Sequence, residues 1–252
     1  MQVWNTVGSW LDRRRTLDGR SMGFVPTMGA LHRGHTSLVE RCRAENQIVV
    51  ASIFVNPSQF NDAKDLERYP RTLENDLAIL ERSGVDEVFV PTAAELYPQG
   101  YRFRVEEQGI TSVMEGCQRP GFLQGVMTVV LKLLNLIRPD RAYFGEKDYQ
   151  QLKIITDMVR DFFIRTEIVP CATVREKSGL AESSRNMLLS AEARRHAASL
   201  FCSLSGASSA EEARAMIESE GFTVDYVEEH WGRRFAAASL NGVRLIDNVP
   251  LS

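Results

Sequence analysis

The sequence is poor in cysteine and lacks long apolar runs, which limits the chemistry and the locations open to it. The four cysteines, Cys42, Cys117, Cys171 and Cys202, stand far apart, without the C-x-x-C spacing of zinc sites and redox centres. We therefore expect buried thiols in a reducing compartment. The N-terminal residues lack the apolar core of a signal peptide, and no run is long enough to span a bilayer. The default expectation is a cytoplasmic, soluble protein.

An excess of charge of one sign is also absent. Lys and Arg number 30 and Asp and Glu 33, which gives a formal net charge of -3. This balance offers no broad attraction to nucleic acid or to an anionic membrane, so we expect neither as a partner. Any bound anion must meet a local cluster of positive groups. A chain of 252 residues can form either one large α/β domain or two smaller domains.

Apolar segments alternate with amphipathic segments over the first 170 or so residues. We predict strands at residues 21–28, 47–55, 86–92 and 165–174, and at residues 141–148 a strand that runs into a turn. We predict helices at residues 35–46, from 71 to a stop at Gly84, from 125 to an end at Pro139, and at 149–163. The alternation indicates an α/β fold with a Rossmann-like, doubly wound parallel sheet, in which ligands bind at the carboxyl ends of the strands.

The pattern changes after about residue 175. Residues 190–221 are rich in Ala and Ser and read as helical, with Ser208 or Ser209 as the N-cap of a second helix. Residues 222–230 and 234–249 read as strands of a small sheet. The sequence therefore predicts a Rossmann-like domain at 1–174 and a smaller α+β domain at 175–252.

Two of the four histidines, His32 and His35, flank Gly34 where a predicted strand turns into a helix. Unpaired N–H groups and the helix dipole favour an anion there, and imidazoles can donate hydrogen bonds to phosphate. Gly29 and Gly34 would allow the backbone to approach a ligand closely. A metal pair needs a third ligand, which no nearby Cys or carboxylate supplies. Two exposed histidines without a role are the remaining alternative, which the position at the turn disfavours.

Polar residues also follow another predicted strand, at residues 144–152. Lys147 suits a contact to phosphate, and Asp148 can hold ribose hydroxyls or the water shell of Mg²⁺. Gln150 and Gln151 are neutral groups able to bind a hydroxy acid. A solvated polar turn is the alternative for any one of them.

Three other polar segments complete the set of candidates. Residues 177–186 carry Ser183, Ser184 and Arg185, which can donate to phosphate, although an interdomain linker is the alternative. Gln59 follows a predicted strand at the same edge of the sheet. Asn75 and Asp76 are expected on a solvated helix face.

Taken together, these segments resemble the pantoate–β-alanine ligase family. The resemblance rests on "PTMGALHRGH" (26–35), "SIFVNPSQF" (52–60), "YPRTLENDL" (69–77), "FGEKDYQQL" (144–152), "GLAESSRN" (179–186) and "RLIDN" (244–248). It implies ATP-dependent condensation of pantoate with β-alanine through a pantoyl adenylate, with release of pyrophosphate and AMP. It also implies Mg²⁺ with the ATP, a C-terminal lid domain and a homodimer.

The resemblance implies roles for individual residues, with no resident metal site. His32 and His35 would contact ATP phosphates, with His35 as a proton donor, while Gln59 and Gln151 would hold pantoate and Gln59 would also lie near β-alanine. The implied catalytic residues are His32, His35, Lys147, Ser183, Ser184 and Arg185. The implied ATP-binding residues are Met28, Gly29, Ala30, Leu31, His32, Arg33, Gly34, His35, Gly145, Glu146, Lys147, Asp148, Val174, Glu182, Ser183, Ser184 and Arg185.

The sequence departs from the family pattern in three places. Phe122 replaces a histidine, Glu182 stands where Met or Leu is usual, and the C-terminal domain looks shorter than in the family. We expect the side chain of Glu182 to point to solvent while its backbone meets the adenine. The alternatives are an inward carboxylate that repels the ATP phosphates, and pairing with Arg175 or Lys177. Two rival functions stay open: another adenylyltransferase of the superfamily, specific for phosphopantetheine or nicotinate mononucleotide, or a catalytically weak ATP-binding homologue.

Overall fold

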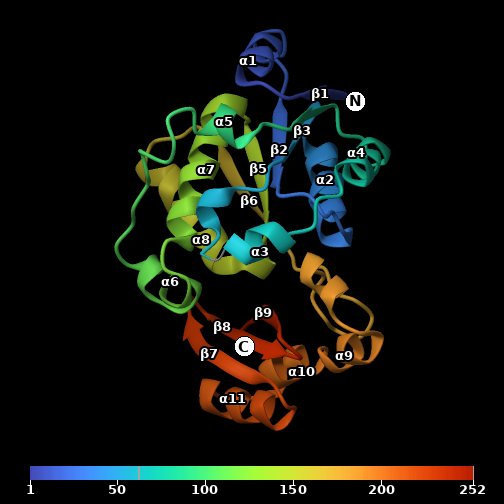
Figure 1. Ribbon diagram of the computed structural model, residues 1–252, viewed down its shortest axis with the longest axis vertical. Helices are drawn as coiled ribbons and strands as arrows, with labels where there is room; N and C mark the ends of the chain where they lie inside the picture. Colours follow the sequence, from blue (N-terminus) through green and yellow to red (C-terminus); the bar gives the residue numbers. More distant parts are fainter. Residues whose placement is uncertain (62, 252) are drawn as a thin grey trace. The chain divides into compact units, whose positions relative to one another are not determined.

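The computed structural model describes residues 1–61 and 63–251, and the chain divides into two compact units (Figure 1). The first unit comprises Met1–Leu31, His35–Gly145 and Gln150–Cys171. The second comprises His32–Gly34, Glu146–Tyr149 and Ala172–Ser252, although Ser252 itself lies outside the described residues. The expected functional division after residue 174 stays a prediction. Within the described part of the chain, no helix is long and apolar enough to cross a membrane.

A parallel sheet of six strands forms the centre of the first unit. Its order is β1 (Gln2–Trp4), β4 (Glu87–Phe89), β3 (Ile48–Ile53), β2 (Met22–Thr27), β5 (Arg141–Gly145) and β6 (Glu167–Cys171). Every neighbouring pair is parallel. All six residues of β3 are buried, as expected for a parallel strand covered on both faces. The predicted Rossmann-like sheet is confirmed, and β1 is an additional strand.

Helices cover both faces of this sheet. The helices of this unit are α1 (Val7–Arg15), α2 (Arg33–Glu45), α3 (Ala63–Arg68), α4 (Leu73–Arg82), α5 (Ala93–Leu96), α6 (Met114–Gln118), α7 (Phe122–Ile137) and α8 (Tyr149–Asp161). Short 3-10 helices span Pro57–Gln59 and Ile110–Ser112, and a third, Glu146–Asp148, belongs to the second unit. The apolar residues of α2 and α4 pack with those of β2, β3 and β4 in one cluster. Figure 1 shows α7 on the other side of the sheet.

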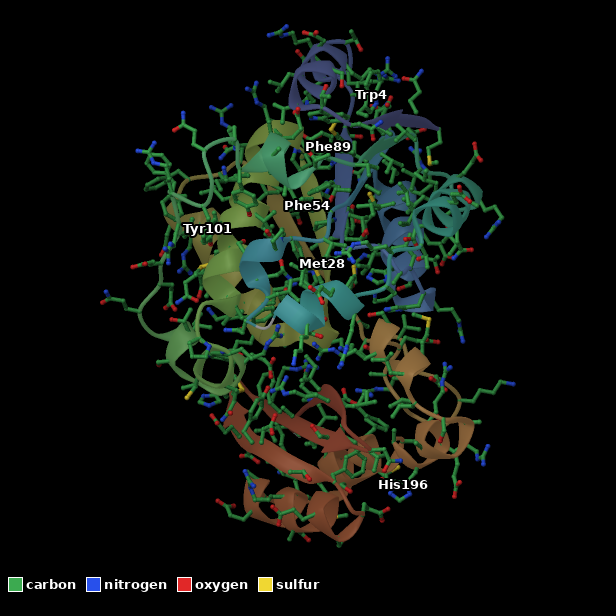
Figure 2. All side chains as sticks on the ribbon, in the orientation of Figure 1. Trp4, Met28, Phe54, Phe89, Tyr101 and His196 are labelled. Atoms are coloured by element: carbon green, nitrogen blue, oxygen red, sulfur yellow. The ribbon has the colours of Figure 1, made fainter. Side chains whose placement is uncertain are left out.

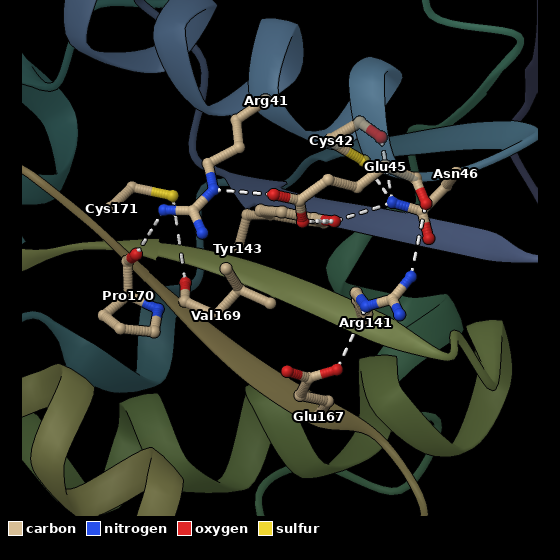
Figure 3. A network of polar contacts seen from close by, with 10 residues as sticks. All are labelled: Arg41, Cys42, Glu45, Asn46, Arg141, Tyr143, Glu167, Val169, Pro170 and Cys171. Carbon is tan, nitrogen blue, oxygen red and sulfur yellow. Dashed lines mark hydrogen bonds and ion pairs between the residues drawn. The ribbon is translucent and has the colours of Figure 1, made fainter.

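A network of polar contacts fixes the C-terminal end of α2 against β5 (Figure 3). The Tyr143 hydroxyl donates to Glu45 Oε2 at 2.8 Å and accepts from Asn46 Nδ2 at 2.7 Å. Burial, followed by the bond to Glu45, raises the pKa of Tyr143, so the phenol stays protonated and remains a donor. This network orients the helix that carries His35 in its first turn.

The four cysteines differ in exposure. Cys42 and Cys171 are buried, and burial raises the pKa of the Cys42 thiol to about 12. Cys117 and Cys202 are exposed. The expectation of four buried thiols is therefore wrong for two, because Cys117 and Cys202 lie on the outer faces of short helices.

The second unit contains an antiparallel sheet and three α-helices. The sheet order is β7 (Thr223–His230), β8 (Arg233–Leu240) and β9 (Val243–Pro250); the helices are α9 (Ala191–His196), α10 (Ser199–Gly206) and α11 (Ala210–Ser219). A 3-10 helix spans Ser184–Leu188. Apolar residues of β8 and β9 share one core with those of α10 and α11. Ser209 is the N-cap of α11, because its side chain accepts from the N–H of Glu212 at 3.2 Å. This confirms the predicted small α+β unit.

Candidate active site

The loop after β2 folds around a buried carboxylate. Gly29 and Ala30 have left-handed backbone angles, with φ of 82° and 50°. Their conformation turns the N–H groups of Ala30 and Leu31 toward Asp76, which accepts them at 3.0 and 2.8 Å. Successive amides in such a turn form an anion-binding concavity, and here the anion is a side chain of α4. Met28, at the start of this loop, is labelled in Figure 2.

The buried position of Asp76 corrects the expectation of a solvated helix face. Its exposed fraction is 1%, whereas Asn75 is exposed as expected. Asp76 lies one helical turn before Leu80, which is 1% exposed, so it belongs to the inward stripe of α4. A Cβ at Gly29 would come within 2.9 Å of Asp76 Oδ2. Gly29 therefore makes room for this carboxylate.

His32 is held as a neutral ring in the second unit. Its Nδ1 accepts the N–H of Gly34 at 3.1 Å, which leaves the ring proton on Nε2. Burial lowers the pKa of His32 to about 4, the charge of Lys147 acts in the same direction, and Asp148 opposes both. A Cβ at Gly34 would come within 2.9 Å of the His32 ring. Around neutral pH, His32 is thus an uncharged hydrogen-bond donor through Nε2.

Lys147 and Asp148 lie in the 3-10 turn that follows β5. Lys147 Nζ is 3.9 Å from Asp148 Oδ1, and the exposed fractions of these side chains are 19% and 48%. The charges of Lys147 and Asp148 act on the pKa of His32 in opposite directions, so both groups lie within electrostatic reach of its ring. The second unit therefore brings together a neutral donor, a cation and a carboxylate from two separate motifs.

The side chain of Glu182 turns inward, contrary to the expectation that it points to solvent. Its exposed fraction is 10%, and Oε1 lies 3.9 Å from Arg33 Nη1. The N–H of Glu182 donates to the carbonyl of Val174 at 2.9 Å, which folds the segment back as a hairpin. Arg175 pairs with Asp247 and not with Glu182. The Cβ of Glu182 lies 3.7 Å from the place that a Cβ at Gly34 would take, so this side chain lies beside the segment of His32.

The serine–arginine segment after Glu182 begins a 3-10 helix. Ser183 is its N-cap and accepts the N–H of Arg185 at 3.3 Å through its hydroxyl oxygen. Ser183, Ser184 and Arg185 are all partly exposed. Asn186 is buried and donates to the carbonyl of Ala181 at 3.0 Å, which closes the turn. The hydroxyl and guanidinium groups are therefore presented from a short, capped segment.

Gln59 lies in the first unit, in the 3-10 turn that follows β3. Its side chain is 8% exposed, and its Oε1 accepts from Asn56 Nδ2 at 3.0 Å. A Cβ at Gly125 of α7 would overlap with the carbonyl of Ser58, so glycine allows α7 to approach this turn. Gln59 borders a pocket whose lining residues are Ser58, Gln59, Phe60, Asn61, Tyr101, Arg104, Glu106, Pro120, Gly121 and Gln124.

The two glutamines at the start of α8 have different environments. Gln150 is 5% exposed; its Oε1 accepts from Glu115 N–H at 3.0 Å. Its Nε2 donates to the carbonyls of Ile110 and Val113 at 2.8 and 2.9 Å. Gln150 is thus a structural residue, although the sequence offered it as a ligand for a hydroxy acid. Gln151 is partly exposed, as a substrate ligand requires.

Phe122, which stands at the start of α7 where the family pattern has a histidine, stacks against a cation. The guanidinium carbon of Arg119 lies 3.8 Å from the centre of its ring.

Within the described residues, no three His, Cys, Asp or Glu side chains form a group that could hold a metal ion.

Comparison with known proteins identifies relatives over the whole length. A family model described as pantoate-beta-alanine ligase matches residues 2–250. The pantothenate synthetase of Bdellovibrio bacteriovorus is 52% identical over 99% of both chains, and that of Legionella pneumophila is 47% identical over 100% of both. A crystal structure of pantoate-beta-alanine ligase from Francisella tularensis, complexed with beta-gamma ATP and beta-alanine, superposes with a TM-score of 0.94. It is 41% identical and covers 99% of this chain and 97% of that one.

These matches correct one expectation from the sequence. The C-terminal domain is not shorter than in these relatives, because the alignments cover 97–100% of their chains. The family match and the identities also settle the resemblance that the motifs indicated. The chain belongs to the pantoate–β-alanine ligase family.

Proposed function

We propose that this protein joins pantoate to β-alanine at the expense of ATP and forms pantothenate, AMP and pyrophosphate. The family match over residues 2–250 carries the proposal. The Francisella tularensis relative, whose crystal structure holds beta-gamma ATP and beta-alanine, supports two of the three substrates. Pantoate is the third substrate, as the family description indicates, and its carboxylate must be activated before an amine can attack it.

The reaction has two steps whose bonds balance. A carboxylate oxygen of pantoate attacks the α-phosphorus of ATP, the bond to the bridging oxygen breaks, and pyrophosphate leaves. The β-alanine amine then attacks the acyl carbon of the pantoyl adenylate, loses a proton, and AMP leaves. The protein contributes by orienting the reactants and by stabilising the charge that develops on phosphate oxygens.

We assign the phosphate contacts to the residues around His32. The neutral ring donates through Nε2, Lys147 supplies a positive charge, and His35 acts as a proton donor. Arg185, Ser183 and Ser184 supply further donors. The full proposed ATP set is Met28, Gly29, Ala30, Leu31, His32, Arg33, Gly34, His35, Gly145, Glu146, Lys147, Asp148, Val174, Glu182, Ser183, Ser184 and Arg185. The amides of Ala30 and Leu31 already bind Asp76, so these two residues would contact ATP through other atoms.

Mg²⁺ would enter with ATP and neutralise part of the triphosphate charge. The half-exposed carboxylate of Asp148, beside Lys147, fits a role in the water shell of that ion. We also propose a homodimer in the cytoplasm, as the family resemblance implies.

Gln59 and Gln151 are the proposed pantoate ligands, with Gln59 also near β-alanine. Asn56 occupies Oε1 of Gln59, so the Nε2 group is the donor that this residue can offer to a carboxylate or hydroxyl. Neutral donors suit a substrate whose carboxylate must remain nucleophilic. A full positive charge at the same place would stabilise the ground state of the attacking oxygen.

The decisive experiment measures pantothenate from pantoate, β-alanine and Mg-ATP with the purified full chain. We expect product that depends on all three substrates, and pyrophosphate exchange into ATP that depends on pantoate. Adenylyl transfer to phosphopantetheine or nicotinate mononucleotide without pantothenate formation would replace the proposal with a related adenylyltransferase. ATP binding with no product would leave only a nucleotide-binding homologue.

A further inference from the structure

The motif "RLIDN" near the end of the chain has no role in the reaction as described so far, although its last residue is buried. Asn248 is 1% exposed and lies in β9, directly opposite Phe235 of β8. A buried amide must have its donors and its acceptor satisfied. The partners of Asn248 therefore indicate what the residue does.

Both donors of Asn248 hold the turn that carries Lys147. Its Nδ2 donates to the carbonyl of Glu146 at 2.9 Å and to the carbonyl of Lys147 at 2.9 Å. Its Oδ1 accepts from Arg233 Nε at 2.6 Å. The side chain of Asn248 thus links two successive carbonyls of the 3-10 turn Glu146–Asp148 to Arg233 of β8.

Arg233 strengthens the same attachment from β8. Its guanidinium lies 3.7 Å from the Glu146 carboxylate and 4.6 Å from the centre of the Tyr149 ring. The Tyr149 ring also contacts Phe235, with 6.0 Å between centroids. The face of the small sheet that bears Arg233, Phe235 and Asn248 therefore holds both ends of residues 146–149.

The opposite face of this sheet packs on helices. Leu245 is 4% exposed and belongs to the core shared with α10 and α11. Because side chains alternate along a strand, Leu245 and Asn248 point to opposite faces. The two functions of β9, core packing and attachment of the turn, can therefore be separated by mutation.

We infer that Asn248 is a positioning residue, which sets the backbone of Glu146 and Lys147 and thereby directs the Lys147 ammonium toward ATP. This inference rests on the proposed role of Lys147 in binding ATP. A lysine is a flexible point charge, so its placement depends on the backbone that carries it. Losing the two bonds would let the turn relax without removing any group that touches substrate.

Asn248→Asp is the sharpest test, because it keeps the shape and the acceptor for Arg233 but removes both donors. An ion pair between the new carboxylate and Arg233 should preserve the fold, while the same carboxylate repels the two carbonyls. We expect Mg-ATP binding, measured by calorimetry on the full chain, to weaken at least tenfold. The KM for pantoate should change less than threefold. Asn248→Ala should give the same split between the two substrates.

Leu245→Ala is the matched control, since it destabilises the same strand from its other face. It should lower the free energy of unfolding but leave the dissociation constant of Mg-ATP within twofold of the parent. Parent-like ATP binding by both Asn248 variants would overturn the inference, as would equal weakening by Leu245→Ala. A parent protein that binds ATP but makes no pantothenate would refute the proposed function alone, because the ATP titrations would still test Asn248.

Discussion

The carboxylate of Asp76 accepts the backbone N–H of Leu31, with 2.8 Å between oxygen and nitrogen across 45 positions of sequence. Its other oxygen accepts the N–H of Ala30 at 3.0 Å and the hydroxyl of Thr72 at 3.1 Å. The two amides that precede His32 are thus held by a side chain of α4. Because Asp76 is 1% exposed, water cannot replace a lost partner there.

Asp76→Asn should destabilise the fold and slow adenylate formation. Its NH₂ group cannot accept from one of the two amides, and an unsatisfied buried group costs about 1–3 kcal/mol. Denaturant unfolding and single-turnover adenylate formation measure the two effects, and we expect the rate to fall more than tenfold. Asn75→Ala, at the exposed neighbouring position, should match the parent in both. Parent-like stability of Asp76→Asn would show that the loop does not depend on this carboxylate.

His35→Ala should leave the fold intact and lower adenylate formation by a factor of ~10² or more, as expected for the loss of a donor that stabilises transition-state charge. Single-turnover measurements with saturating ATP and pantoate report this step. His196→Ala is the control, because His196 lies in α9 and contacts the carbonyl of Glu220 at 2.7 Å. A rate within a few-fold of the parent for His35→Ala would remove His35 from the proposed mechanism.

The low pKa of His32, about 4, predicts a specific pH dependence of stability. The unfolded ring has a pKa near ~6.5. Between these values the unfolded chain holds a proton that the folded chain lacks, so stability should rise with pH from 4 to 6.5 and level off above. His32→Gln should remove this part of the slope. Nitrogen NMR of the ring should show the proton on Nε2 at pH 7; a ring that titrates near 6.5 in the folded protein would contradict the burial argument.

Gln59 and Gln151 should control the pantoate requirement more than the ATP requirement. Gln59→Glu keeps the acceptor for Asn56 but places a negative charge against a substrate carboxylate, and Gln151→Ala removes a donor. We expect the KM for pantoate to rise at least tenfold, about 1.4 kcal/mol, with the KM for ATP within threefold. Gln108→Ala, at an exposed position, is the control. Equal effects on both substrates would exclude direct contact with pantoate.

The strands and long helices of the first unit follow from local patterns. The β-branched run Ile48–Ile53 and the apolar stripe of α7 can each be recognised within one segment. Hydrophobic periodicity reports burial against whatever lies on either side, so it needs no knowledge of the neighbours. Short elements such as β1 and α6 lack enough periods and were not predicted.

The contacts of single polar residues could not be predicted in the same way. Asp76 and Gln150 are polar residues on helices. From the local sequence alone, a polar residue on a helix is expected to lie on the exposed face. Their burial depends on backbone amides and carbonyls that reach them from distant segments. The one available signal for Asp76 was its position on the inward stripe of α4, one turn before Leu80. For Asn248, no local pattern indicated the turn of Lys147.

Glu182 is a charged residue in the proposed ATP segment whose carboxylate is largely buried, with 10% of the side chain exposed. Arg33, its partner at 3.9 Å, is 74% exposed, and such a pair contributes only ~0–1 kcal/mol. Two unit charges ~8 Å apart at an effective dielectric of ~20 interact by roughly 2 kcal/mol before screening. Because Arg33 is so exposed, it offsets only part of the repulsion that this carboxylate would exert on a triphosphate.

Glu182→Gln should tighten Mg-ATP binding by up to about tenfold, ~1.4 kcal/mol, since it removes the charge and keeps the backbone bond to Val174. The tightening should be larger at low salt, because screening weakens the repulsion at moderate salt. Calorimetric titration at two salt concentrations measures both effects. Glu192→Gln makes the same change in net charge at an exposed position of α9 and should leave binding unchanged. Weaker ATP binding by Glu182→Gln would mean that the carboxylate serves mainly to hold Arg33. Its loss would then loosen the segment that carries Arg33 instead of removing a charge repulsion on the ATP phosphates.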